Sequence, residues 1–191
     1  MEWVFDGGRP CLDLVNTTRN RHAEPVELLT GPEALAEWLE LAGFTTGRVP
    51  VTAGNVLAAK ALREAIDRVL LPPEEPEKMD VELVNNAAAS APAPPPRLVL
   101  SEGGLRREVP APKDPVATAF AALAADAIDL ATGDAAVRVC AADDCGLRFC
   151  DASPRRNRQW CSMARCGNRA KARAHYARVS GRQDVVSGNS G

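Results

Sequence analysis

Two short stretches decide the fold of this chain: CAADDCG at residues 140–146 and WCSMARCGNR at residues 160–169. Each stretch holds two cysteines separated by four residues, and fifteen residues lie between the two pairs. Zinc prefers four ligands in a tetrahedron, and two short loops that each supply two thiolates meet that requirement. We therefore predict one structural zinc ion, bound by Cys140, Cys145, Cys161 and Cys166.

Other interpretations of these cysteines stay open. Ordinary buried thiols are one, although packing alone gives no reason for two equally spaced pairs. Thiol redox chemistry is another, although the chain has no Cys-x-x-Cys motif. A catalytic zinc needs an open coordination position, which four cysteines would fill. We assign Cys11 and Cys150 to packing, with a redox partnership between Cys150 and a ligand cysteine as the alternative.

Charge is unevenly divided along the chain. Residues 138–182 carry eleven Lys or Arg and three Asp, whereas residues 1–137 carry twelve basic and twenty-one acidic side chains. The net charge of -2 therefore hides a basic C-terminal part, which favours a polyanionic partner such as nucleic acid. The alternative is a solvated basic face, or one docked on the acidic body of the same or another chain.

The sequence favours a cytoplasmic protein that does not contact a membrane. It has no run of about 18 apolar residues, and residues 1–6, MEWVFD, lack the basic flank and long apolar stretch of a signal peptide. Disulfides are uncommon in a reducing compartment, which again favours metal binding by the clustered cysteines.

Residues 1–133 are predicted to form a mainly helical α+β domain with a small β element. Apolar residues at helical spacing, with capping residues and prolines at the ends, predict helices at residues 32–42, 52–71, 79–89 and 115–132. A glycine-bearing loop between residues 97–100 and 105–109 predicts a β-hairpin. The proline-rich residues 91–96 before it should be extended, and residues 10–17 are interpreted as a short strand or extended segment.

Residues 134–182 are predicted to form a four-cysteine zinc finger, built from a β-hairpin and a basic helix, followed by a flexible tail at 183–191. Residues 147–151 should form one strand, 153–157 a turn and 158–160 the returning segment, so that the two cysteine pairs lie side by side. The helix is expected to open at Cys166 and to end near Val179.

The C-terminal stretch resembles a known family. Residues 160–171, WCSMARCGNRAK, are similar to the CGNR zinc finger, which is named for the run found here at residues 166–169. In that family the finger follows a larger domain of α and β structure called ABATE, described as part of a stress-induced transcription regulator. Residues 11–17 and 34–39 resemble the opening pattern of ABATE, so the resemblance covers nearly the whole chain. Cys150 departs from the pattern, because a bulky residue such as Tyr is expected there.

The loop between the cysteine pairs and the basic helix hold the candidate residues for nucleic-acid binding. Contacts to phosphates would supply affinity that falls with salt, while base contacts by Asn168 or Arg169 would supply sequence preference. The candidates are Arg155, Arg156, Arg158, Arg165, Asn168, Arg169, Lys171, Arg173 and Arg178.

Four polar residues near the N-terminus are candidates for a small-molecule pocket, because they accompany an apolar segment. They are Asp13, Asn16, Thr17 and Arg19. Turn capping and hydrogen bonding within the core are the alternative roles for these side chains.

These features favour a DNA-binding transcription regulator with a structural zinc site and an N-terminal domain that senses a ligand or mediates association. The alternative is a zinc-stabilised module that binds protein or RNA without sequence-specific DNA binding. We expect no enzymatic activity, because the chain offers no pair of nucleophile and base. The expected partners are DNA, a small-molecule effector and a second copy of the chain, since a dimer suits operator binding.

Overall fold

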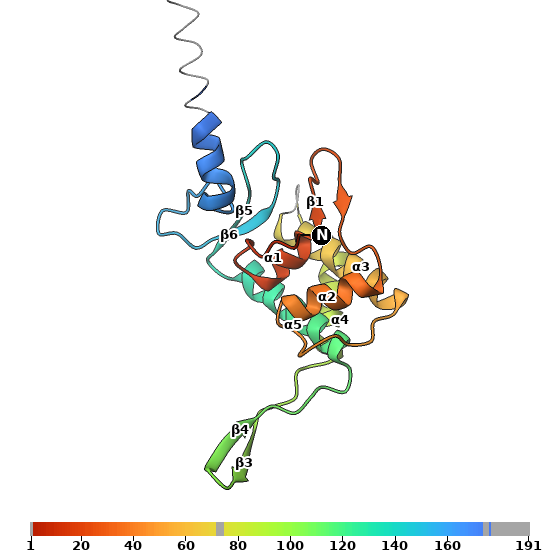
Figure 1. Cartoon of the computed structure of the whole chain (residues 1–191). Coiled ribbons are helices and arrows are strands. Elements are labelled where there is room, and N and C mark those ends of the chain that lie inside the picture. Colours follow the sequence, from red (N-terminus) through yellow and green to blue (C-terminus); the bar gives the residue numbers. More distant parts are fainter. Residues whose placement is uncertain (1, 72–74, 174–175, 177–191) are drawn as a thin grey trace, which may run out of the picture.

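The computed structural model describes residues 2–71, 75–173 and 176. Figure 1 shows a helical body, a β-hairpin that projects from one end, and a smaller C-terminal unit at the other end. The helices of the body are α1 (Pro10–Val15), α2 (Pro32–Leu41), α3 (Ala53–Leu70), α4 (Lys78–Ser90) and α5 (Pro115–Thr132). The antiparallel strand pairs are β1 (Thr18–Arg19) with β2 (Val26–Glu27), β3 (Arg97–Ser101) with β4 (Gly104–Glu108), and β5 (Ala136–Val139) with β6 (Arg148–Asp151). The predicted α+β fold class is confirmed.

The long helices begin at capping residues that the sequence indicates. At the start of α3, the Thr52 hydroxyl accepts a hydrogen bond from the Asn55 N–H at 3.1 Å, and Asn55 Oδ1 accepts one from the Thr52 N–H at 2.8 Å. This reciprocal pair is a capping box. At the start of α5, the Asp114 carboxylate accepts from the Ala117 N–H at 2.9 Å. The other two predicted helices are confirmed as α2 and α4, and the predicted hairpin as β3 and β4.

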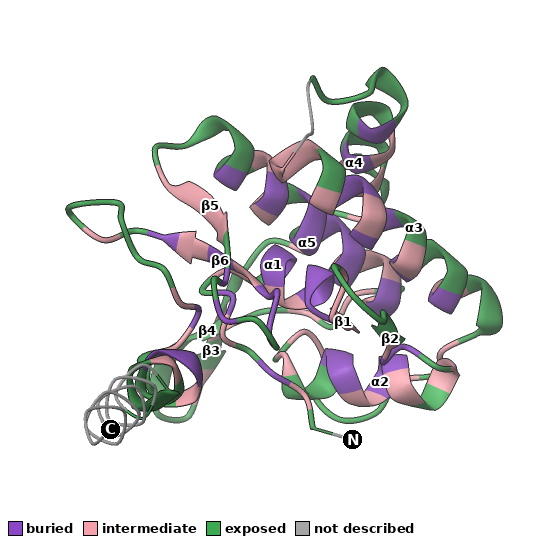
Figure 2. Cartoon of the chain, turned by 90° about the horizontal axis from the view of Figure 1, so that it is seen from above, coloured by how far each residue is buried: buried purple, intermediate pink, exposed green. Residues whose placement is uncertain are grey.

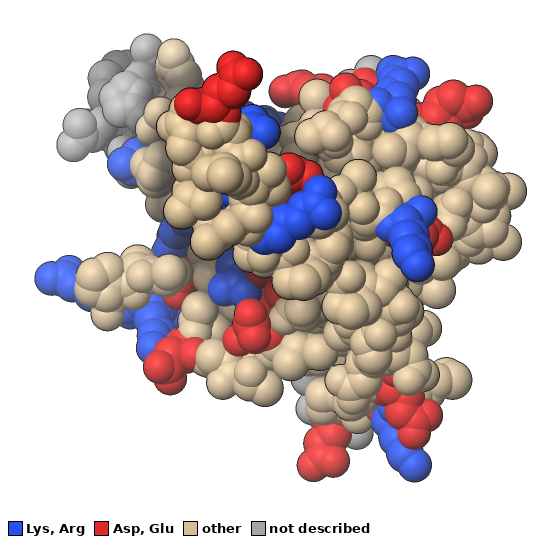
Figure 3. Space-filling model, turned by 90° about the horizontal axis from the view of Figure 1, so that it is seen from below, with Lys and Arg blue, Asp and Glu red and all other residues tan. Residues whose placement is uncertain are grey.

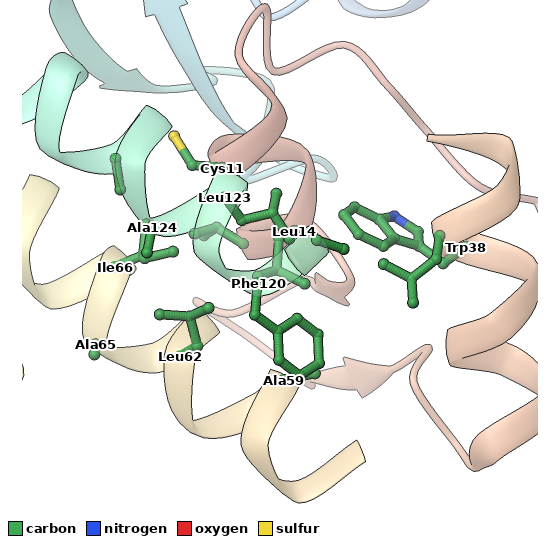
Figure 4. Close-up of a cluster of buried hydrophobic side chains, with 14 of the residues drawn as sticks. Cys11, Leu14, Trp38, Ala59, Leu62, Ala65, Ile66, Phe120, Leu123 and Ala124 are labelled. Atoms are coloured by element: carbon green, nitrogen blue, oxygen red, sulfur yellow. The ribbon is translucent and has the colours of Figure 1, made fainter. Parts of the chain in front are cut away.

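The core of the body lies between α1, α2, α3 and α5. Figure 4 shows side chains from these helices converging, among them Leu14, Trp38, Leu62 and Phe120, all buried. Figure 2 shows that buried residues of α1, α3 and α5 lie where these helices meet. Alanine and aliphatic side chains fill most of the remaining core, in keeping with an aromatic content of only 4%.

Helix α5 is the one described helix that is long and apolar enough to span a membrane by length and composition. Its apolar character also suits its place in the body, because it packs against α1, α3 and α4. Its buried residues are Val116, Ala119, Phe120, Ala121, Leu123, Ala124, Ala127 and Leu130.

Residues 10–17 are mostly helical, so the prediction of a strand or extended segment is wrong. The apolar residues of α1 are Cys11, Leu12, Leu14 and Val15, each with an exposed fraction of 0%. A run of six residues that is buried on several sides carries no periodicity that separates a strand from a helix. The start of α1 is stabilised from outside, because Asp126 of α5 accepts a hydrogen bond from the Cys11 N–H at 2.9 Å.

Asn16 joins the body to the C-terminal unit. Its side chain is buried, with its Nδ2 donating to the Arg148 carbonyl at 2.9 Å and its Oδ1 accepting from the Arg148 N–H at 2.8 Å. The Arg148 guanidinium in turn donates to both carboxylate oxygens of Asp67 in α3, at 2.8 and 3.0 Å. The Cys150 N–H donates to the Gly7 carbonyl at 2.8 Å. Strand β6 is therefore held by the body along its length.

We predict that Asn16→Ala lowers the free energy of unfolding by about 2–4 kcal/mol. The substitution leaves the N–H and the carbonyl of Arg148 without partners, and each such buried group costs ~1–3 kcal/mol. Urea unfolding followed by circular dichroism measures the change. Asn86→Ala, at an exposed position of α4, is the control and should shift stability by less than ~0.5 kcal/mol. Equal stability of the two variants would contradict this role of Asn16.

Candidate metal centre and basic surface

The hairpin of β5 and β6 presents the first cysteine pair. Val139 pairs with Arg148, and the Cys140 N–H donates to the Leu147 carbonyl at 2.8 Å, so Cys140 and Cys145 lie in the connection between the strands. The predicted partner of β6 was the returning segment 158–160, and this prediction is wrong. Strand β5 precedes the first cysteine, and its pairing with β6 is what closes the first metal loop.

The returning segment has a different task, because it places the second cysteine pair beside the first. The Gln159 carbonyl accepts a hydrogen bond from the Ala141 N–H at 2.8 Å. The Arg158 N–H donates to the buried carboxylate of Asp151 at 2.9 Å, and the Arg158 guanidinium lies 5.1 Å from the centre of the Phe149 ring, within cation–π range. These contacts bring residue 161 next to the first loop.

The four predicted ligands meet at one point. The sulfurs of Cys140, Cys145, Cys161 and Cys166 lie within 4.8 Å of one another, and all four residues are buried. The sulfurs of Cys145 and Cys161 are 3.7 Å apart, and those of Cys161 and Cys166 are 3.8 Å apart. A tetrahedron with zinc–sulfur bonds of ~2.3 Å has edges of about 3.8 Å. The cluster therefore fits one structural zinc ion with a closed coordination shell.

The electrostatics of the cluster also favour a cation. Hydrogen bonds from the neighbouring thiols, first of all Cys161, lower the pKa of Cys145 to about 5, whereas burial raises the pKa of Cys166 to about 12. Without a metal ion, the cluster therefore favours deprotonation of one thiol and disfavours deprotonation of a second. A zinc ion supplies the positive charge that further thiolates need. The Cys161 N–H lies 3.5 Å from the Cys140 sulfur and an Arg169 nitrogen 3.8 Å from the Cys166 sulfur, both as donors.

Gly146 allows the first metal loop to turn. Its φ of 65° lies in the left-handed region, which glycine adopts without strain. A Cβ at this position would also collide with the imidazole of His22. His22 belongs to the body, and its Nε2 lies 3.1 Å from the Asp143 carbonyl. The glycine therefore serves the metal loop and its contact with the N-terminal domain together.

The C-terminal helix begins before Cys166, three residues earlier than predicted. Ser162 is the N-cap, and a π-helical turn η1 (Met163–Gly167) leads into helical residues 168–173. The Ser162 hydroxyl accepts from the Arg165 N–H at 3.4 Å, so the cap lies between the two cysteines. Cys166 is therefore held inside a helix while Cys161 stays in the preceding segment. The predicted end near Val179 lies outside the described residues.

Three of the predicted nucleic-acid residues form ion pairs within the chain. Arg165 is half-buried and pairs with Asp6 at 3.0 Å. Arg169 and Arg173 both pair with Asp144 of the first metal loop, at 2.8 and 2.9 Å, which places them on one side of the helix. On the face of the molecule that Figure 3 draws, basic side chains are interspersed with acidic ones.

The remaining predicted nucleic-acid residues lie at the surface wherever the structure describes them. Arg155, Arg156 and Arg158 are exposed in the loop between the cysteine pairs, although Arg158 also donates to the carbonyls of Trp160 and Cys161. Asn168 and Lys171 are exposed on the helix, and Arg178 lies outside the described residues. The helix and the loop belong to one unit.

Three of the four candidate pocket residues make hydrogen bonds within the chain. Asn16 bonds to β6, and the buried Thr17 hydroxyl donates to the Leu14 carbonyl at 2.7 Å. Asp13 accepts a hydrogen bond from the Gly7 N–H at 2.9 Å. These contacts correspond to the alternative roles in capping and core hydrogen bonding. A ligand pocket for the N-terminal domain stays a prediction.

Arg19 does line a cavity, and sequence reasoning missed its neighbours. The cavity has a volume of about 340 Å³, lies between the body and the C-terminal unit, and also contains Asp144, Cys145, Arg165 and Arg169. Burial, together with the charge of Arg165, lowers the pKa of Arg19, while thiolates at the metal loops act in the opposite direction. Arg19 and the cysteine cluster thus stabilise each other's charge, a relation between residues far apart in sequence.

Taken together, the helical body and the four-cysteine site define a zinc-finger protein with a separate N-terminal domain. A family model for ABATE, described as "Putative stress-induced transcription regulator", matches residues 8–134, and a model for the CGNR zinc finger matches residues 136–179. The chain belongs to the ABATE family and carries a CGNR zinc finger, which confirms the predicted family. No curated protein matches the chain. The predicted boundaries at residues 133 and 182 stay predictions.

We predict one zinc ion per chain in protein purified under reducing conditions without chelators. Cys161→Ser should lose most of this zinc, because it removes one of four sulfurs at a buried centre. Elemental analysis gives the stoichiometry. Cys150→Ser is the matched control and should keep its zinc, since Cys150 packs against the body core rather than the cluster. Zinc-free parent protein, or full occupancy in Cys161→Ser, would contradict the assignment.

We also predict a pH effect at Asp13. Burial raises the pKa of this carboxyl to about 7, although the hydrogen bond from Gly7 acts against the shift. The unfolded carboxyl titrates near ~4, so the folded state binds more protons than the unfolded state between about pH 4 and 7. The stability that Asp13 contributes is therefore present below about pH 4 and is lost as the pH rises towards 7.

Asp13→Asn should accordingly be more stable relative to the parent at pH 8 than at pH 5, because the amide carries no charge to bury. Thermal unfolding across this range measures the difference. Asp129→Asn, at an exposed position of α5, is the control and should leave the pH profile of the parent unchanged. A parallel pH profile in Asp13→Asn and the parent would refute this effect.

Proposed function

We propose that this protein is a DNA-binding transcription regulator whose zinc finger carries the DNA contacts. The observation that supports it most is a basic helix on the side of the C-terminal unit away from the helices of the body, beside an arginine-bearing loop of the same finger (Figure 1). Exposed Lys171 on the helix and exposed Arg155 and Arg156 on the loop have no ion pair with an acidic residue in the described part of the chain. Such side chains suit DNA phosphates.

The ion pairs of the helix are compatible with this proposal. Arg169, Arg173 and Asp144 keep between 42 and 51% of their side chains exposed. Exposed ion pairs contribute at most ~1 kcal/mol, so a phosphate can replace Asp144 as the partner of either arginine. Arg165 differs, because its pair with Asp6 ties the helix to the N-terminal segment. We assign Arg165 to holding the helix in place and Asn168 to contacting bases.

The description of the ABATE family supports regulation of transcription under stress. We propose that this regulation takes place in the cytoplasm and involves no catalytic step. We further propose that the N-terminal domain responds to a small-molecule effector. The cavity beside Arg19 supports this part, because it lies between the domain and the finger. A ligand in this cavity would contact Arg165 and Arg169 and would therefore act directly on the helix that carries them.

The test is binding to a mixed-sequence DNA duplex, measured by fluorescence anisotropy over a series of salt concentrations. The affinity should fall steeply with salt, and Arg155→Gln/Lys171→Gln should reduce the logarithmic salt slope by about 2, since each phosphate contact contributes ~0.9. Arg48→Gln, at an exposed position of the body, is the control and should match the parent.

Two results would count against DNA binding. If the protein leaves the fluorescence anisotropy of duplex DNA unchanged at low salt, the proposal is wrong. Tight binding to single-stranded RNA with none to the duplex would favour the alternative of an RNA-interaction module. A selection from random duplexes then tests base recognition, where Asn168→Ala should lose sequence preference while keeping the salt slope of the parent.

A further inference from the structure

The hairpin of β3 and β4 is a feature for which the proposed function has no use. It projects away from the body in Figure 1, at the end remote from the finger. Prolines flank it on both sides, in the segments APAPPP at residues 91–96 and VPAP at 109–112. Proline-rich segments are extended and stiff, so they hold the hairpin away from the body.

The two faces of the hairpin differ in polarity. Leu100 pairs with Leu105 and Leu98 with Arg107, and directly opposite residues share a face of the sheet. Leu98, Leu100 and Leu105 therefore share one face, which also carries Arg107 at its base. The exposed fractions of the three leucines are 73, 80 and 71%. The other face carries an ion pair of Arg97 with Glu108 at 2.6 Å.

An amphipathic hairpin of this size exposes its leucines to water, which is unfavourable. A lone two-stranded hairpin is marginally stable, and its usual support is a further layer against its apolar face. Contiguous exposed apolar residues on a small unit mark an interaction site. Within the described chain the leucines remain largely exposed, so the missing layer must come from another molecule.

We propose that the hairpin packs face to face with the hairpin of a second copy of this chain, in antiparallel orientation. Charge complementarity supports this partner: Arg107 lies towards the base of the hairpin and Glu102 at its tip, both exposed. An antiparallel stack brings Arg107 of one copy next to Glu102 of the other, while Leu100 and Leu105 meet their counterparts in the middle. A parallel stack would place like charges together.

The size of the face sets the strength of the association. Three leucines per copy cover much less than the ~800 Å² per partner of a standard interface. We therefore expect a reversible dimer with a dissociation constant in the micromolar range. The association needs neither zinc nor DNA, so its test is independent of the proposed function.

The experiment is sedimentation-velocity ultracentrifugation of the zinc-loaded full chain between about 1 and 200 μM, a range that brackets micromolar association. The parent should pass from monomer to dimer within this range. Leu100→Asp should weaken the dimer by at least ~100-fold, because it buries a carboxylate between two leucine faces. Leu57→Asp, at a leucine of α3 that is 69% exposed, is the matched control and should dimerise like the parent.

A charge exchange tests the antiparallel arrangement. Arg107→Glu should weaken the dimer several-fold, and the double variant Arg107→Glu/Glu102→Arg should restore it. Circular dichroism and zinc content should match the parent in every variant, because the substituted residues are exposed. A parent that stays monomeric up to about 200 μM overturns the proposal, as does a dimer insensitive to Leu100→Asp or equally weakened by Leu57→Asp. Failure of the double variant to recover overturns the antiparallel stack.

Discussion

The C-terminal unit depends on the need of four buried sulfurs for a cation. Its own apolar core is small, consisting of little more than Leu147, Phe149 and the cysteines, with Val4 from the N-terminal segment and partly buried Trp160 against it. A core of this size cannot hold a hairpin, a returning loop and a helix together by burial alone. All three meet at the metal site, so the metal–sulfur bonds supply the stabilisation that a larger apolar core would otherwise provide.

Contacts between the body and the parts around the metal site join the finger and the ABATE domain into one structure. Asn16 and Asp67 of the body bind Arg148 at the edge of the hairpin, and Asp6 binds Arg165 on the helix. Arg19 shares a cavity with Cys145. The body thereby touches each part that the metal holds, and a change in the N-terminal domain has a direct physical route to the orientation of the basic helix. The proposed response of the N-terminal domain to an effector requires such a route.

Local features of the sequence predict much of this architecture, whereas long-range contacts do not follow from it. The spacing of the cysteines predicts the metal site, and Thr52 and Asp114 predict helix starts, because each signal lies within a few residues. The helical state of residues 10–15 depends on Asp126 and on burial between distant helices. Likewise, the choice of β5 over residues 158–160 as partner of β6 and the pairing of Asp144 with Arg169 arise only once the chain has folded.

The four cysteines of the two loops are placed to bind one tetrahedral zinc ion as thiolates. X-ray absorption at the zinc edge of the purified, reduced protein tests it most directly. We expect a first shell of four sulfurs at ~2.3 Å with no nitrogen or oxygen neighbour. A shell with fewer sulfurs, or one completed by nitrogen or oxygen at ~2.0–2.1 Å, would contradict it.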